Sequence, residues 1–164
     1  MSIGIGFAGA HRTGKTFLAS KLSELVGVPF VKSDVSGVYA RNDMIPSQVY
    51  TPDKTIFIQN KILDYHNELW DKQTGVFITD RTPIDMLGYM MCNMPQNFID
   101  DEINEGLQDY TKRCFESTEK YFKSVVEVLP GIPVVEDTLK ASIQTSHIDH
   151  VAYVITGILD RFES

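Results

Sequence analysis

The residues best suited to chemistry lie near the N-terminus, in a short loop between two apolar segments. Residues 9–16 read Gly-Ala-His-Arg-Thr-Gly-Lys-Thr and match the pattern GxxxxGK[ST] in full. In this pattern the backbone N–H groups surround the β- and γ-phosphates of a nucleotide, the lysine reaches the same oxygens, and the last hydroxyl holds Mg²⁺. The loop therefore predicts an ATP and Mg²⁺ site. Its expected nucleotide contacts are Gly9, Ala10, His11, Arg12, Thr13, Gly14, Lys15 and Thr16.

The pattern predicts a specific role or orientation for three side chains of this loop. Lys15 is expected to be catalytic and to lie on an exposed loop, and Thr16 is expected to be a metal ligand. The His11 ring is expected to face outward, so that only its backbone joins the phosphate cradle. The apolar run 3–8 predicts a buried strand before the loop, and helical spacing of apolar residues follows it. The phosphates would then sit at a helix N-terminus, which favours anions.

Two further residues that could take part in chemistry, Asp80 and Arg81, follow the short apolar run 76–79. An acidic residue at the end of a core strand beside the phosphate loop is expected to hold Mg²⁺ through water. NTPases that drive motion usually place a Glu after this Asp to activate water, whereas this chain has Arg81. We therefore expect phosphoryl transfer rather than hydrolysis, with both residues catalytic and Asp80 a metal ligand. The alternative is an ordinary ion pair that caps the strand.

The acceptor side depends on Asp34, which ends the apolar segment 28–31 and is expected to face the same crevice. A hydroxyl acceptor needs a carboxylate that takes its proton, and Asp34 could serve. A phosphate acceptor needs no base, and Arg41 or Arg81 would clamp it. The alternative for Asp34 is a turn residue next to Ser33.

Other polar and aromatic residues are weaker candidates. Gln59 lies in a partly apolar helical stripe and could read a base edge, although a solvated position is equally compatible. Tyr89 could stack on a base, and Tyr39 and Tyr50 share that potential. Asp85 fits a helix capping box that begins at Thr82, which favours a structural role.

Composition bounds the class of protein. The chain has 164 residues, 43% hydrophobic content and a formal charge of −7, which predict one domain of ordinary size over residues 1–164. No apolar run approaches a membrane span, and we expect a cytoplasmic protein with reduced thiols and no membrane partner. The acidic charge disfavours a nucleic-acid partner without ruling it out. A homodimer is left open.

Strand and helix patterns alternate along the chain, which predicts an α/β fold with a parallel sheet. Helices are expected over about 51–72, from 82 onward, over about 98–119 and over 147–162, and another strand over 125–129. Residues 35–50 show no clear periodicity and predict a mobile excursion. The β-branched run 151–156 leaves a fifth strand open as an alternative to the last helix.

Two segments resemble small P-loop kinases of nucleosides and nucleotides, closest to nicotinamide-riboside kinase domains and phage deoxynucleotide kinases. They are the loop 9–16 and residues 80–89, Asp-Arg-Thr-Pro-Ile-Asp-Met-Leu-Gly-Tyr, similar to the family's DR…D.L.Y segment. About the first 90 residues match well, and the remainder matches only in layout. The resemblance implies a three-layer sandwich with a five-stranded, or four-stranded, parallel sheet. It also implies an acceptor-binding region over about 33–60 and a lid over about 130–146.

The chain departs from this family at the lid, where relatives usually place arginines. Between Lys123 and Arg161 the only cation is Lys140, which would then contact ATP unless Arg12 or Arg113 supplies the charge. We expect an ATP-dependent phosphotransferase with a nucleoside-type acceptor, preferably a nucleoside or deoxynucleoside monophosphate. The alternatives are a kinase of a hydroxymethylated pyrimidine, free or in DNA, and a non-catalytic nucleotide sensor or slow ATPase.

Overall fold

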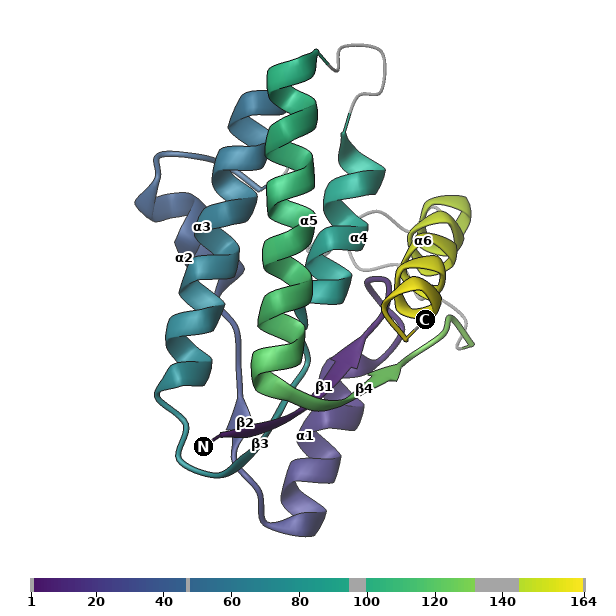
Figure 1. Cartoon of the computed structure of the whole chain (residues 1–164). Coiled ribbons are helices and arrows are strands. Elements are labelled where there is room, and N and C mark those ends of the chain that lie inside the picture. The colour runs from purple at the N-terminus through teal and green to yellow at the C-terminus, as the bar shows by residue number, and fades with distance from the viewer. Residues whose placement is uncertain (1, 47, 95–99, 132–144, 164) are drawn as a thin grey trace.

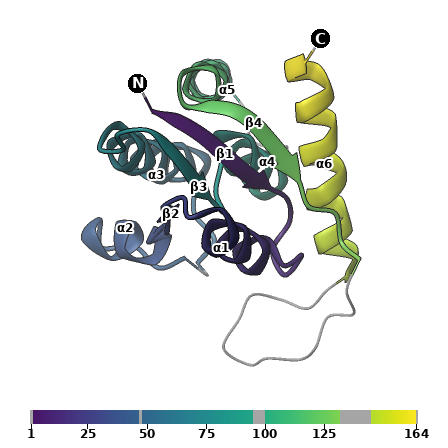
Figure 2. The ribbon, with the colours of Figure 1, turned by 90° about the horizontal axis from the view of Figure 1, so that it is seen from below.

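A computed structural model describes residues 2–46, 48–94, 100–131 and 145–163. Its centre is a parallel sheet whose strands are β1 (Ile3–Ala8), β2 (Phe30–Val31), β3 (Val76–Thr79) and β4 (Phe122–Glu127). The strand order is β2-β3-β1-β4, and Figure 2 shows the strands in this sequence. The four-stranded version of the predicted α/β sandwich is confirmed.

Helices cover both faces of this sheet. They are α1 (Lys15–Val26), α2 (Val35–Arg41), α3 (Pro52–Asp71), α4 (Pro83–Asn93), α5 (Asp101–Tyr121) and α6 (Thr145–Glu163). In Figure 1, α3, α5 and α4 stand side by side above the sheet with α6 beside α4, and α1 lies below. Within the residues that the structure describes, no helix is both long and apolar enough to cross a membrane.

The two faces bury apolar clusters of unequal size. The larger one lies between the sheet and helices α3 to α6 and contains the fully buried Trp70, Phe77 and Leu87. The smaller one joins Phe7, Ile78 and Val128 of the sheet segments to Ala19 of α1. The buried strands fix the edge at which the loops that follow β1, β2 and β3 emerge together.

Local signals explain where most helices begin. The α3 helix starts with Pro at its first position after Thr51, as predicted. The predicted capping box of α4 is present, because Thr82 and Asp85 bond each other's backbone N–H groups. The carboxylate of Asp100 caps α5 by accepting from the Ile103 N–H at 2.9 Å.

Three predictions differ from the structure. The strand expected over 125–129 is β4, which begins earlier, at Phe122, and ends at Glu127, because it pairs with β1. The irregular excursion 35–50 contains the seven-residue helix α2, which Asp34 caps by accepting from the Gly37 N–H at 2.9 Å. A fifth strand over 151–156 is wrong, since this run lies within α6. Val151 and Ile155 of that run are fully buried, and Ile155 packs so closely on Gly88 that a Cβ there would lie 2.5 Å from its Cγ1. Packing of one helical face therefore overrides the β propensity of Val and Ile.

Candidate active site

The loop between β1 and α1 has the backbone that a phosphate cradle requires. Gly9 has φ +145°, and a Cβ there would lie 2.5 Å from the carbonyl oxygen of Val128. Gly14 and Arg12 also have positive φ, at 92° and 63°. Only glycine is tolerated at position 9, because a side chain there would strain the backbone and clash with Val128, which follows β4. The Thr13 hydroxyl donates to the Ala10 carbonyl at 3.0 Å and so braces the loop from inside.

Lys15 is buried rather than exposed, which corrects the expectation from the sequence. Its side chain is only 7% exposed, and its Nζ donates to the Ala10 carbonyl at 2.5 Å. Burial lowers the pKa of Lys15 to about 8, although the neighbouring Asp85 and Asp80 carboxylates oppose this shift. The ammonium group is thus folded back across the cradle, where it completes the loop's positive lining.

Thr16 and Asp80 come together across the end of the sheet. The exposed Thr16 donates its hydroxyl proton to Asp80 Oδ2 at 2.5 Å, although the two residues are 64 positions apart. Asp80 is 9% exposed, and its Oδ1 is buried with no hydrogen-bond partner among the described residues. A hydroxyl and a carboxylate with an unused oxygen suit Mg²⁺, which prefers oxygen ligands and keeps several waters. The residues present therefore fit the predicted metal.

Arg81, the residue after Asp80, contacts Asp85 and Tyr89 of α4. Its Nη1 donates to Asp85 Oδ2 at 3.0 Å, and its guanidinium carbon lies 5.4 Å from the centre of the Tyr89 ring. The Arg81 side chain is 30% exposed, whereas Asp85 is fully buried. The Asp80–Arg81 pair is therefore not a mutual ion pair at a strand end, because Asp80 bonds Thr16 and Arg81 bonds Asp85.

Arg81 lines a cavity of about 180 Å³ that lies between α2, α3 and α4. Three predicted acceptor residues, Gln59, Arg81 and Tyr89, line it together. The rest of its lining is Val35, Tyr39, Pro46, Ile62, Met86 and Asn93. Gln59 is 8% exposed and is one of the lining residues, so it does not occupy a solvated helix position. Sequence reasoning missed Val35 and Asn93, since both reach the cavity only through the packing of short α2 and the end of α4.

Asp34 and Arg41 do not line this cavity. Asp34 is exposed at the start of α2, next to the lining residue Val35, and its carboxylate caps that helix. Arg41 is exposed, and its guanidinium lies 5.2 Å from the centre of the Tyr65 ring. Arg113 is bonded to Asn60 and Asp64 of α3, which engages it in the α3–α5 contact. Lys140 and the predicted lid 130–146, apart from its ends 130–131 and 145–146, lie outside the described residues.

The His11 ring does not face outward, in contrast to the prediction. Its Nδ1 lies 3.5 Å from the Tyr89 hydroxyl, and its ring centre lies 5.7 Å from that of His147 in α6. Burial raises the pKa of Tyr89 to about 12, so this hydroxyl stays protonated and can donate to His11. The phosphate loop therefore directly contacts a residue that lines the cavity beside Arg81. Sequence spacing could not reveal this contact, because 78 positions separate the two residues.

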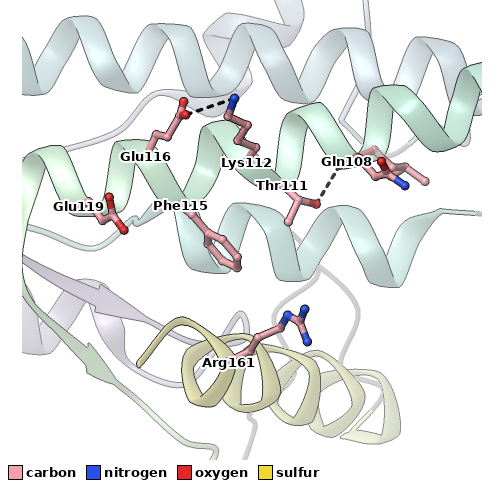
Figure 3. Close-up of a pocket in the computed structure, with 8 residues that line it drawn as sticks. Gln108, Thr111, Lys112, Phe115, Glu116, Glu119 and Arg161 are labelled. Atoms are coloured by element: carbon pink, nitrogen blue, oxygen red, sulfur yellow. Dashed lines mark hydrogen bonds and ion pairs between the residues drawn. The ribbon is translucent and has the colours of Figure 1, made fainter. Parts of the chain in front are cut away.

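A separate hollow of about 430 Å³ lies between α5 and α6. Figure 3 shows Phe115 of α5 and Arg161 of α6 facing it, with an ion pair between Lys112 and Glu116 on its rim. Its lining shares no residue with the phosphate loop or with the cavity beside Arg81. This groove is therefore separate from the sheet edge that carries the predicted site residues.

A phosphate loop after the first strand of a parallel sheet, with an acidic residue after the neighbouring strand, defines a P-loop protein. A family model described as AAA domain matches residues 5–141, which is most of the chain. The protein belongs to this AAA domain family. No curated protein matches the chain in a sequence search.

Solved structures share the fold at low sequence identity. NadR in complex with NAD and AMP-PNP superposes with a TM-score of 0.67 at 16% identity, and the match covers 99% of this chain and 42% of NadR. Thymidylate kinase from Ehrlichia chaffeensis gives 0.60 at 16% identity and covers 98% and 87% of the two chains. Deoxyadenosine kinase from M. mycoides with bound dCTP gives 0.60 at 14%, covering 98% and 83%. The chain thus spans less than half the length of NadR.

Proposed function

We propose that the protein is an ATP-dependent phosphotransferase whose acceptor is a nucleoside monophosphate or deoxynucleoside monophosphate. The observation that carries this proposal is the juxtaposition of two half-sites at one sheet edge. Asp80 contacts Thr16 of the phosphate loop, and the next residue, Arg81, opens into the cavity lined by Gln59 and Tyr89. Adjacent residues of one strand end therefore face the donor and the acceptor sides.

The donor side consists of the phosphate loop, Lys15, Thr16 and Asp80. Phosphoryl transfer needs positioning and positive charge around the transferring group more than covalent help from the protein. ATP phosphates would displace the Lys15 ammonium from the Ala10 carbonyl and bind it instead. Thr16 and Asp80 would hold Mg²⁺, which would supply positive charge against the negative charge that develops on the phosphates.

The acceptor side favours a phosphate over a hydroxyl. None of the described residues that line the cavity is a carboxylate, and the cation among them is Arg81. A cavity without a base but with a guanidinium suits a group that is already ionised and needs no proton removed. The Tyr39 and Tyr89 rings offer surfaces for a base, and the Gln59 amide can donate to and accept from a base edge.

The names of the structural neighbours include both kinds of acceptor. A thymidylate kinase and a deoxyadenosine kinase share the fold, and one of the latter structures holds bound dCTP. Thymidylate is a monophosphate and deoxyadenosine is a nucleoside, so the choice of a monophosphate rests on the lining of the cavity.

The experiment is a transfer assay with γ-labelled ATP and Mg²⁺. The acceptors are a panel of nucleosides, their 5′-monophosphates, and DNA that contains hydroxymethylated pyrimidines, with Lys15→Ala as the inactive control. We expect label in a nucleoside diphosphate, with ADP formed in equal amount. A labelled nucleoside monophosphate formed from a nucleoside, or label in DNA, would overturn the monophosphate proposal. Tight ATP binding without any labelled product would instead favour a nucleotide sensor, and release of free phosphate would favour a slow ATPase.

A further inference from the structure

The buried carboxylate of Asp85 makes more contacts than a helix cap requires. Its Oδ1 accepts from the Thr82 backbone N–H at 2.6 Å and from the Thr82 hydroxyl at 2.7 Å. Its Oδ2 accepts from Arg81 Nη1 at 3.0 Å. A capping box needs one carboxylate oxygen. The second oxygen is therefore available to fix the Arg81 guanidinium.

Tyr89 bounds Arg81 on another side. The guanidinium lies 5.4 Å from the centre of its ring, within the range of a cation–π contact. Asp85 and Tyr89 lie one turn apart in α4, and Arg81 comes just before the N-cap Thr82 and contacts both of them. A long, flexible side chain is thus restrained by a fully buried anion and an aromatic face, beside the cavity that it lines.

We propose that Asp85 is a positioning residue that, with Tyr89, holds Arg81 in the orientation that binds the acceptor's phosphate. The inference rests on the proposed function, because it assigns a partner to the Arg81 clamp. An arginine has five N–H donors, and the ion pair with Asp85 occupies Nη1. The remaining donors face a phosphate without first reorganising, which preserves the charge-assisted bonds that Arg81 can form.

The first test is a double-mutant cycle between Asp85→Asn and Arg81→Gln. In Asp85→Asn the new amide carbonyl can still accept from the Thr82 N–H, but the amide N–H group no longer attracts the guanidinium. We expect Asp85→Asn to raise the KM of the best of the four common deoxynucleoside 5′-monophosphates by roughly 10- to 100-fold. The KM of ATP should change less than about twofold. In the Arg81→Gln background the same change should have little further effect on the acceptor's KM.

Thr82→Val is the matched control. It removes the hydroxyl that bonds Asp85 Oδ1 and leaves the Arg81 contact on Oδ2 in place. We expect a lower Tm with the acceptor's KM unchanged. Equal rises in KM for Thr82→Val and Asp85→Asn would overturn the inference, because both would then act through the cap. Additive effects in the cycle with Arg81→Gln would overturn it as well.

A second measurement does not depend on turnover. Phenylglyoxal modification of Arg81, followed by mass spectrometry, reports how firmly the guanidinium is held. Arg81 should react several-fold faster in Asp85→Asn than in the wild type, and Thr82→Val should match the wild type. An unchanged rate in Asp85→Asn would overturn the positioning role. A faster rate in a protein that phosphorylates no acceptor would retain that role while the proposed function fails.

Discussion

At the residue scale, Lys15 is the position where function and stability conflict. Its buried ammonium group donates to the Ala10 carbonyl, and burial lowers its pKa to about 8. Between pH 8 and the unfolded value near 10.5 the unfolded chain binds more protons, so the free energy of unfolding rises with pH across that window. The charged form is therefore a cost to the fold at neutral pH, and ATP phosphates would relieve it.

We predict that Lys15→Met loses transfer by about 10³-fold or more and does not lose stability. The lysine supplies charge to the transition state, as donors aimed at developing charge do in other enzymes. The substitution also removes a desolvated cation, whose burial lowers the free energy of unfolding by at most about 3 kcal/mol at neutral pH. Thermal melts at pH 7 should show an unchanged or higher Tm for Lys15→Met without nucleotide. A large drop in Tm would show that Lys15 supports the loop structurally.

Replacing Asp34 distinguishes a phosphate acceptor from a hydroxyl acceptor. Asp34 also caps α2, so the test needs a substitution that preserves the cap. Asn caps helices about as well as Asp, so Asp34→Asn should leave α2 in place. With a phosphate acceptor we expect kcat within a fewfold of the wild type and any loss to appear in KM. A hydroxyl acceptor would instead lower kcat by about 10² to 10⁴. Steady-state kinetics with varied acceptor separate the two outcomes, and a collapse of kcat alone would contradict the monophosphate proposal.

At the element scale, the α3 helix contains a titratable group that is buried without a full set of partners. His66 is 1% exposed, and its Nδ1 lies 2.7 Å from the Ile62 carbonyl, so that nitrogen donates in the neutral ring. Its Nε2 has no hydrogen-bond partner among the described residues. Burial lowers the pKa of His66, although the backbone bond to Ile62 opposes the shift.

The sign of the resulting pH dependence follows from linkage. With the folded pKa below the unfolded value of about 6.5, the unfolded state binds more protons as the pH falls below 6.5. Stability is then lost at up to about 1.4 kcal/mol per pH unit until the folded ring also protonates. We predict that urea titrations at pH 7.5, 6.5 and 5.5 show this loss in the wild type and a smaller slope in His66→Gln. His150→Gln, at an exposed position of α6, is the control and should keep the wild-type slope. Equal slopes in all three proteins would contradict the assignment.

The same scale shows how far sequence alone predicts this fold. The apolar runs before residues 9 and 80 and the Thr-Pro starts of α3 and α4 are local signals, and the structure has strands and helices there. Helix α2 is short and half-exposed, so it has no periodicity to detect. The start of β4 at Phe122 rather than at residue 125, and the helical state of 151–156, depend on pairing with β1 and packing on α4. Such contacts between distant segments have no local signature.

The sequence likewise predicts some parts of the candidate site and misses others. The motif places Thr16 near Asp80, because parallel strands end at one sheet edge. Gln59, Arg81 and Tyr89, which the sequence suggests separately for the acceptor, line one cavity. The burial of Lys15 and the inward position of His11 were not predicted. Both depend on how the phosphate loop folds and packs, and motif spacing does not specify the direction of a side chain.

At the scale of the whole molecule, the donor and acceptor sides are joined through His11 and Tyr89. His11 belongs to the phosphate loop, Tyr89 lines the acceptor cavity, and the His11 ring also lies beside His147 at the start of α6. Occupancy of the loop by ATP phosphates would fix the loop backbone and with it the His11 ring. A fixed His11 holds the Tyr89 ring beside Arg81, so ATP should strengthen binding of the acceptor.

We therefore predict that Tyr89→Phe weakens the coupling between the two substrates more than it weakens either binding event alone. The change removes the hydroxyl, which contacts His11 and also hydrogen-bonds the Arg81 side chain, and it retains the ring beside Arg81. One hydrogen bond of this kind is worth about 0.5 to 1.5 kcal/mol, so the factor by which AMP-PNP lowers the acceptor's Kd should fall roughly 2- to 10-fold. Calorimetric titration of a deoxynucleoside monophosphate with and without AMP-PNP measures that factor. Tyr39→Phe is the matched control, because it makes the same change in the same cavity at a residue of α2. If Tyr39→Phe reduces the coupling as much as Tyr89→Phe, the contact with His11 does not join the two sites.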